Sequence, residues 1–174
     1  GVKTKKIATA ISKAKGAEGR MQCVHFGTFS VYIDYAHTPD GLKKVLNALR
    51  NKTDGRLICV FGCGGNRDGG KRYEMGAISA KYADFTIITS DNPRYEEPME
   101  IIYEIERGHL SVGKNYVLIQ DRYSAIKYAI KNAKKGDVIV VAGKGSENYQ
   151  EVLGVKRPYK DKDAIEEILW SKEE

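Results

Sequence analysis

The sequence predicts an α/β domain of Rossmann-like, three-layer architecture, with a mostly parallel sheet, helices on both faces and a C-terminal hairpin. Short runs rich in β-branched residues alternate with segments of helical periodicity along five successive units. The runs are almost wholly apolar, as expected for parallel strands that helices cover on both faces. Polar or Gly-rich loops follow four of the runs, at the edge of the sheet where ligands bind in such folds.

Each expected element has a local signal. Strands are expected at residues 29–35, 57–61, 85–89, 116–119 and 138–142. Helices are expected at 40–49, from the second loop to about 83, at 98–110 and at 123–133. The first helix places four apolar residues on one face, and Pro98 suits the first turn of the third. After residue 142 the alternation gives way to a hairpin at 149–159, turning at Gly154, and a short helix at 163–170.

The first 28 residues stand outside this alternation. Residues 3–15 are basic and have the composition of a helix, whereas residues 19–26 are interpreted as a connector. We therefore expect residues 1–28 to be a linker or the tail of a preceding domain, and residues 29–174 to be the α/β domain.

Composition argues against several classes of function. The net charge is +6, but Lys and Arg are spread along the chain rather than clustered with aromatic residues, so no nucleic-acid partner is expected. A basic surface also suits small anionic substrates. No apolar run approaches the roughly 18 residues of a membrane-spanning helix, and the N-terminus lacks the apolar core of a signal peptide. A cytoplasmic protein without a membrane partner is therefore expected.

The three cysteines show no metal-binding spacing, so neither a metal site nor a disulfide framework is expected. Cys59 and Cys63 lie in or beside an apolar strand. We interpret both as small buried hydrophobes.

The loops expected at the carboxyl edge of the sheet are residues 34–40, 62–68, 91–94 and 143–147. The second begins like the dinucleotide-binding G-x-G-x-x-G pattern, but Arg67 occupies the sixth position, so a hydride-transferring enzyme loses its main support. In the fourth, Lys144 is followed by Gly145, which does not fit the phosphate loop G-x-x-x-x-G-K-[ST]. The sequence therefore contains no recognisable device for ATP phosphates.

Charged residues in these loops have the chemistry of an amino-acid site. In the tetrapeptide Asp91-Asn92-Pro93-Arg94 the proline stiffens the backbone, so an amide and a cation in fixed relation could grip a carboxylate. Arg67 and Arg94, opposed by the carboxylate of Glu147, would complement a zwitterionic amino acid with an extra carboxylate.

Simpler interpretations stay open for each loop. They are a tight strand-to-helix turn at 62–68, a plain proline turn with a solvated Arg94, and a solvated pair of Lys144 with Glu147. His37 could contact a nucleotide or cap the following helix together with Thr38 and Asp40.

The four loops together resemble those of the Mur ligase family. The matching stretches are residues 34–40, 60–68, 89–94 and 142–145, in the order and spacing of the family, and the resemblance runs from about residue 19 to the C-terminal helix. The family's enzymes have three domains, of which the central one binds ATP and the third, Rossmann-like, binds the incoming amino acid. The resemblance implies that residues 29–174 are this third domain and residues 1–28 the tail of the central one, or a linker.

The resemblance also implies a function: an ATP-dependent, ADP-forming ligase that adds meso-diaminopimelate to UDP-MurNAc-L-Ala-D-Glu in bacterial peptidoglycan synthesis. The missing N-terminal and central domains would be partners of this one, with ATP and Mg²⁺ bound mainly by the central domain, so the chain is expected to be inactive alone. No catalytic residue is assigned within it. The implied contacts to the amino acid are Arg67, Asp91, Asn92, Pro93, Arg94, Gly143 and Glu147. Asp34 and His37 would lie towards the nucleotide.

One residue departs from the pattern of the family. Ser146 stands where the family commonly has histidine, next to Glu147, and a serine has no ring and no titration near neutral pH. This leaves L-lysine or lanthionine as alternative amino acids. A stand-alone α/β small-molecule-binding module is the alternative from a different class.

Overall fold

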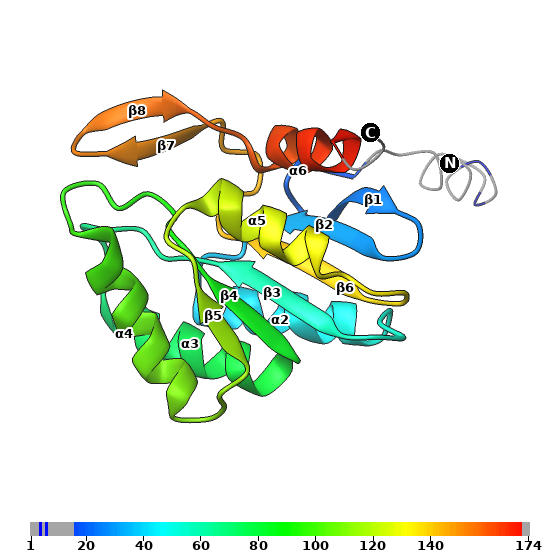
Figure 1. Cartoon of the computed structure of the whole chain (residues 1–174), viewed down its shortest axis with the longest axis horizontal. Coiled ribbons are helices and arrows are strands. Elements are labelled where there is room, and N and C mark those ends of the chain that lie inside the picture. The colour runs from blue at the N-terminus through cyan, green and yellow to red at the C-terminus, as the bar shows by residue number, and fades with distance from the viewer. Residues whose placement is uncertain (1–3, 5, 7–15, 172–174) are drawn as a thin grey trace.

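Six strands form one sheet in the order β1-β2-β6-β3-β4-β5 (Figure 1). The computed structural model describes residues 4, 6 and 16–171, so the helix expected at 3–15 lies almost wholly outside the described residues. The strands are β1 (Gln22–Phe26), β2 (Ser30–Asp34), β3 (Leu57–Phe61), β4 (Phe85–Ile88), β5 (Tyr116–Leu118) and β6 (Val138–Ala142). All neighbouring pairs are parallel except β1 with β2, which confirms the mostly parallel sheet.

Strand β1 corrects one expectation. Residues 22–26 were expected to be part of a connector, but they pair antiparallel with β2 at the edge of the sheet. The pairing contains a register shift between Cys23 and His25. All five residues are at least partly exposed, so the strand lacks the apolar run that marks a buried strand in a sequence.

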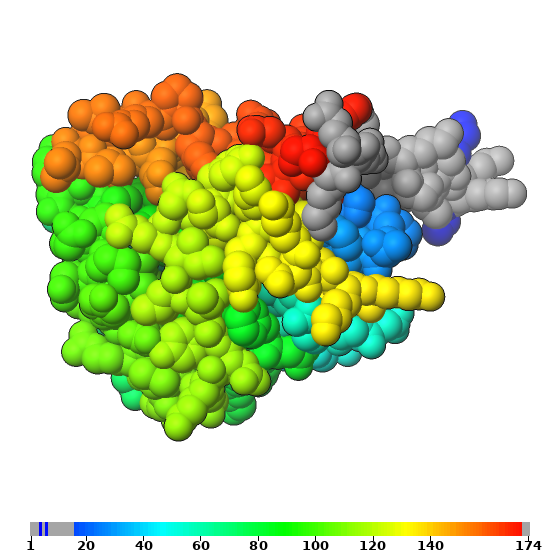
Figure 2. Space-filling view, viewed as in Figure 1, coloured from blue at the N-terminus to red at the C-terminus, as the bar shows by residue number. Residues whose placement is uncertain are grey.

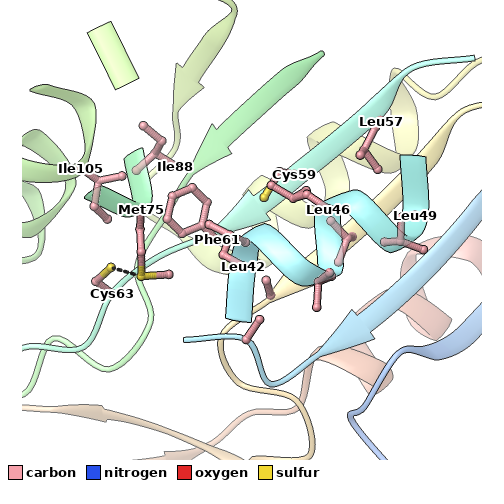
Figure 3. Packing of buried hydrophobic residues seen from close by; sticks show 14 of the residues in the cluster. Leu42, Leu46, Leu49, Leu57, Cys59, Phe61, Cys63, Met75, Ile88 and Ile105 are labelled. Atoms are coloured by element: carbon pink, nitrogen blue, oxygen red, sulfur yellow. Dashed lines mark hydrogen bonds between the residues drawn. The ribbon is translucent and has the colours of Figure 1, made fainter. Parts of the chain in front are cut away.

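Helices cover both faces of the sheet, which confirms the three layers. On one face lie α2 (Pro39–Arg50), α3 (Gly70–Tyr82) and α4 (Pro98–Leu110); on the other lie α5 (Arg122–Lys131) and α6 (Asp161–Trp170). Strand β3 is buried on both sides: Leu57, Cys59 and Phe61 pack against the first group, and Ile58 and Val60 against the second. Figure 3 shows the first of these clusters. Two cores thus fix the sheet between its helices.

The cysteines of this core are free thiols, as expected. Cys59 and Cys63 are buried, and burial raises the pKa of each thiol to about 12. Cys63 Sγ lies 3.7 Å from Met75 Sδ (Figure 3). Both side chains therefore act as small hydrophobes.

The hairpin expected near Gly154 consists of β7 (Tyr149–Val152) and β8 (Val155–Pro158). Leu153 and Gly154 have φ of 50° and 75°, which is the geometry of a two-residue hairpin turn. The hairpin forms a separate two-stranded sheet, seen in orange beyond the carboxyl edge of the main sheet (Figure 1). Within the described residues, no helix combines the length and the apolar character needed to cross a membrane.

Helices α3 and α4 approach each other through two glycines. A Cβ on Gly76 would lie 2.0 Å from the carbonyl oxygen of Ile105, and a Cβ on Gly108 would lie 1.9 Å from that of Tyr73. Both distances are far below van der Waals contact, and both atoms belong to the backbone. The close packing of the two helices therefore requires glycine at both positions.

We expect Gly76→Ala to lower the free energy of unfolding, because the methyl group forces α3 and α4 apart. Overpacking of this kind costs about 1–3 kcal/mol or more, against a gain in helix propensity of at most about 1 kcal/mol. Thermal and urea unfolding measure the change. Gly113→Ala is the control, because its Cβ would meet Ala80 only at van der Waals distance, 3.6 Å from the Cβ and 3.8 Å from the carbonyl oxygen. Equal stability of the two variants would contradict this account.

Candidate functional site

A cavity of about 600 Å³ opens at the carboxyl edge of the sheet, where the loops after β2, β3, β4 and β6 meet. Its lining includes seven of the nine residues proposed from the sequence: His37, Arg67, Asp91, Asn92, Arg94, Gly143 and Glu147. Pro93 and Asp34 are buried behind it. Further lining residues that the sequence-based interpretation did not select are Tyr35, Lys71 and Tyr149. The expectation that these loops share one edge is thus confirmed.

Glycines let the loops after β3 and β4 come into contact. A Cβ on Gly62 would lie 2.1 Å from the carbonyl oxygen of Thr89, and one on Gly65 would lie 1.9 Å from that of Pro93. Gly65 N donates to Asn92 O at 2.9 Å. The glycines therefore bring one loop against another, whereas the sequence alone suggested only a turn or an approach to a ligand.

Arg94 is held by the protein on two sides. Its Nη1 donates to Gly65 O at 2.8 Å, and its Nε lies 3.3 Å from Glu151 Oε2 on β7. The side chain is only 19% exposed, so the alternative of a solvated arginine on a plain turn is wrong. Its backbone has a φ of 54°, a left-handed conformation that costs a non-glycine residue about 1–2 kcal/mol. The structure stabilises this residue in a strained and defined position.

Lys144 is the main residue that sequence reasoning missed. Its side chain is completely buried, and its Nζ donates to Asn92 Oδ1 at 2.9 Å and Glu147 Oε2 at 3.1 Å. Asp91 Oδ1 lies 3.8 Å away. The alternative of a solvated Lys144–Glu147 pair is therefore wrong for the lysine. Its place two residues after β6 (Val138–Ala142), a wholly buried strand, indicated burial but not the partners of the lysine.

Asn92 organises this cluster. Its Nδ2 donates to Glu147 Oε2 at 2.9 Å, and its Oδ1 also accepts from Glu151 N at 3.0 Å. The sequence-based interpretation paired the amide with Arg94 on a ligand carboxylate. In the structure the amide instead fixes Lys144 and Glu147 relative to each other.

Asp91 contributes a buried carboxyl to the cavity, with 8% of the residue exposed. Burial raises its pKa, and the charges of Arg122 and Lys144 only partly oppose this effect. Opposite it stands Gly143, where a Cβ would lie 2.6 Å from Asp91 Oδ2. Only glycine at 143 leaves room for this carboxyl group.

Two further cations line the cavity, Arg67 and the half-buried Lys71. Arg67 is exposed there, and Lys71 Nζ donates to His37 O at 2.9 Å. The helix cap that was one interpretation of this segment is made by Thr38, whose hydroxyl accepts from Gly41 N at 3.2 Å. The His37 ring is exposed and lines the cavity, so it is available to a ligand.

The side chain of Asp34 accepts hydrogen bonds from the backbone. Its two carboxylate oxygens accept from Met21 N at 2.7 Å and from Ala36 N at 2.8 Å. It therefore fixes the end of β2 and the segment before β1, and the side chain is buried.

A buried ion pair lies behind the site. Arg122, the first residue of α5, bonds to both carboxylate oxygens of Asp161, the first residue of α6, at 2.8 and 2.9 Å. The same guanidinium donates to Ser90 O at 3.3 Å and Ala142 O at 3.0 Å. These carbonyls follow β4 and end β6, on either side of β3. Arg122 therefore ties together the two loops that supply Asp91 and Glu147.

The lining of the cavity thus carries charges of both signs, the cations Arg67, Lys71 and Arg94 and the carboxyl groups of Asp68, Asp91 and Glu147. Among the described residues, no group of His, Cys, Asp and Glu side chains is arranged to hold a metal ion. Fold and site are those of an α/β domain with a cavity, lined by charges of both signs, at the carboxyl edge of a parallel sheet, where ligands bind in such folds.

The chain belongs to the Mur ligase family: residues 19–145 match the family described as "Mur ligase, glutamate ligase domain". It is 47% identical over 174 residues to the UDP-N-acetylmuramoyl-L-alanyl-D-glutamate--2,6-diaminopimelate ligase of Caldanaerobacter subterraneus subsp. tengcongensis, covering 99% of this chain and 36% of that protein. A ligase of the same name from Clostridium acetobutylicum, numbered 1, is 50% identical over 97% of this chain and 35% of its own length. The chain therefore spans about a third of the curated relatives it matches.

Solved structures of similar fold support this family assignment. A structure of a UDP-N-acetylmuramoyl-L-alanyl-D-glutamate--2,6-diaminopimelate ligase superposes with a TM-score of 0.86 at 38% identity, over 99% of this chain and 36% of that one. A bifunctional folylpolyglutamate synthase/dihydrofolate synthase from Yersinia pestis shares the fold alone, with a TM-score of 0.63 at 19% identity over 82% of this chain and 32% of that one.

We expect Asp91→Asn to stabilise the fold increasingly as pH rises. The raised pKa means that the folded state disfavours the ionised carboxyl, so the wild type loses stability as pH rises from the unfolded pKa, near 3.8, through the folded one. The asparagine variant avoids this loss. Urea unfolding between pH 4 and pH 8 measures the difference.

Asp84→Asn is the control of opposite sign. Hydrogen bonds from Arg50 and Leu57 lower the pKa of Asp84, although burial opposes them. That variant should lose stability relative to the wild type as pH rises. A benefit of Asp91→Asn that is greatest at pH 4 and vanishes at pH 8 would contradict the assignment.

We expect Asp161→Asn to lower the free energy of unfolding by about 3–5 kcal/mol, because Arg122 then keeps an uncompensated buried charge. The double variant Arg122→Met/Asp161→Leu should recover much of that loss, since it removes both charges. Chemical denaturation of the three proteins measures this. Equal losses in the single and double variants would show that the charge of Arg122 is not the cause.

Proposed function

We propose that this chain is the amino-acid-binding C-terminal domain of an ATP-dependent, ADP-forming ligase that adds meso-diaminopimelate to UDP-MurNAc-L-Ala-D-Glu in peptidoglycan synthesis. The observation that carries the proposal is that Arg67 and Arg94 line the same cavity as Asp91 and Glu147. meso-Diaminopimelate has a carboxylate and an ammonium group at each end, so it needs partners of both signs. The names of the relatives support the choice of amino acid.

The remaining parts of the enzyme lie outside the described residues in this proposal. Residues 1–28 join the amino-acid domain to the central, ATP-binding domain, with residues 22–26 contributing β1. Lys144, the one lysine in a loop that resembles part of a phosphate loop, is buried and bonded to Asn92 and Glu147, so this lysine is not free to bind an ATP phosphate. We place ATP and Mg²⁺ on the central domain, and expect the chain alone to be inactive.

Other aspects of the proposal follow from the same assignment. The partners are meso-diaminopimelate, the UDP-MurNAc-dipeptide and the N-terminal and central domains, and the place of action is the cytoplasm, with neither nucleic acid nor membrane as a partner. Asp34 and His37 would lie on the side of the nucleotide once the domains close.

Within this mechanism the chain contributes orientation. In the proposed reaction ATP phosphorylates the γ-carboxylate of D-glutamate and leaves as ADP. The amine of the amino acid then attacks the γ-carbonyl carbon of this acyl phosphate, so that the C–N bond forms as the C–O bond to phosphate breaks, and the amine loses a proton. Holding the amino acid by its charged ends turns a bimolecular encounter into an attack between fixed groups. Closure of the domains would also exclude water, which competes for the activated carboxyl. We assign no proton transfer or bond-breaking step to a side chain of this domain.

We expect the chain to bind meso-diaminopimelate more tightly than L-lysine, which lacks the second carboxylate. Arg94→Ala should weaken binding of meso-diaminopimelate by roughly ten- to a hundredfold, the worth of a charged hydrogen bond, and change that of L-lysine little. Calorimetric titration of both proteins with both ligands measures this.

Lanthionine belongs in the same titration. Ser146 beside Glu147 is exposed and has no ring where the family commonly has histidine, so a related diamino diacid is the competitor to test. A preference for lanthionine would keep the ligase and change its product. Binding of L-lysine as tight as that of meso-diaminopimelate, unaffected by Arg94→Ala, would contradict the proposal.

A further inference from the structure

Hydrogen bonds join the hairpin β7–β8 to the tetrapeptide Asp91-Asn92-Pro93-Arg94. Gln150 Nε2 donates to Asp91 O at 2.8 Å, Arg94 N donates to Glu151 O at 3.0 Å, and Leu153 N donates to Arg94 O at 2.6 Å. These contacts make Arg94 a one-residue parallel bridge to β7. In the space-filling view the orange hairpin lies directly against the green part of the chain (Figure 2). The hairpin therefore holds the backbone of the site.

The side chain of Glu151 in the hairpin also contacts the guanidinium of Arg94. Glu151 Oε2 lies 3.3 Å from Arg94 Nε, and the two side chains are 18% and 19% exposed. On the other side, Arg94 Nη1 donates to Gly65 O at 2.8 Å. An ion pair from one element and a hydrogen-bond acceptor from another thus hold this planar group on two sides. The guanidinium has five N–H donors, so donors remain for a ligand in the cavity that Arg94 lines.

The backbone of Arg94 makes this support necessary. Its left-handed φ of 54° is unfavourable for a side chain with a Cβ, and the surrounding structure has to hold it. A long, flexible side chain leaving a strained backbone position has many rotamers, and ordering such a side chain costs conformational entropy. A carboxylate of the fold placed beside Nε reduces this cost before the ligand arrives, because it already orders the side chain.

We propose that Glu151 is a positioning residue that determines specificity: it aims the Arg94 guanidinium at the second carboxylate of the amino-acid substrate. Glu151 acts through Arg94 and is not among the residues that line the cavity. The identity of the ligand in this inference rests on the proposed function, whereas the positioning of Arg94 does not.

The first test needs no ligand. Hydrogen exchange of the Arg94 Nε–H is followed by NMR in the wild type, in Glu151→Val and in Glu151→Gln, with the signal assigned by its loss in Arg94→Lys. Valine keeps the strand propensity of β7 and removes the acceptor, while glutamine keeps an acceptor oxygen. Exchange should be slow in the wild type, fast in the valine variant and slow again with glutamine. Equal exchange rates in all three, or a glutamine variant as fast as valine, would overturn the proposal.

The second test measures selectivity as the ratio of the Kd for L-lysine to the Kd for meso-diaminopimelate. Glu151→Val should reduce this ratio by roughly tenfold, the worth of about one oriented hydrogen bond, and Glu151→Gln should restore most of it. A loss of affinity for both ligands by the same factor would mean a structural role and overturn the claim of specificity. Glu166→Ala is the matched control, because it removes a carboxylate from the 3.6 Å pair with Lys162 on α6.

The two tests separate the two claims. A wild-type chain that shows no preference for meso-diaminopimelate would contradict the proposed function, and the exchange measurement would still decide whether Glu151 positions Arg94.

Discussion

A single buried guanidinium, that of Arg122, holds the functional edge of this domain together. It neutralises Asp161 at the start of α6 and donates to the backbone after β4 and at the end of β6. Strand β3 lies between those two strands, so one side chain spans the width of three strands. A fully buried arginine is stable only with such a complete set of acceptors. The separation of the two loops that carry Asp91 and Glu147 depends on it.

The geometry of the rest of the site depends on close contact between two loops and on a buried lysine that balances two carboxyl groups. Gly62 and Gly65 let the loop after β3 touch the loop after β4, which places Arg94 beside the Gly-rich loop. Lys144 is an internal counter-ion for Asp91 and Glu147, so two carboxyl groups can stand in one cavity. Because these partners belong to the protein, the charges that face a ligand are ordered before it binds.

Much of the fold and part of the site could be predicted from the sequence. A buried parallel strand is a continuous apolar run in the sequence, so the strand at 138–142 was predicted at its observed bounds. The half-exposed edge strand β1 was missed for the same reason, since it has no such run. The helix at 98–110 was also predicted at its observed bounds, because Pro98 marks its first turn. Lys144, Glu151 and Arg122 were missed because their roles depend on partners 52, 57 and 39 positions away in the chain, which no local pattern records.

The most direct test of the account is a crystal structure of this chain with meso-diaminopimelate. The account predicts one molecule in the cavity, with a carboxylate on the guanidinium of Arg94 and an ammonium group on the side of Asp91 and Glu147, while Lys144 keeps its bonds to Asn92 and Glu147. A ligand bound elsewhere, or one whose carboxylates both avoid Arg94, would contradict the central claim that this cavity is built to recognise the two charged ends of a diamino diacid.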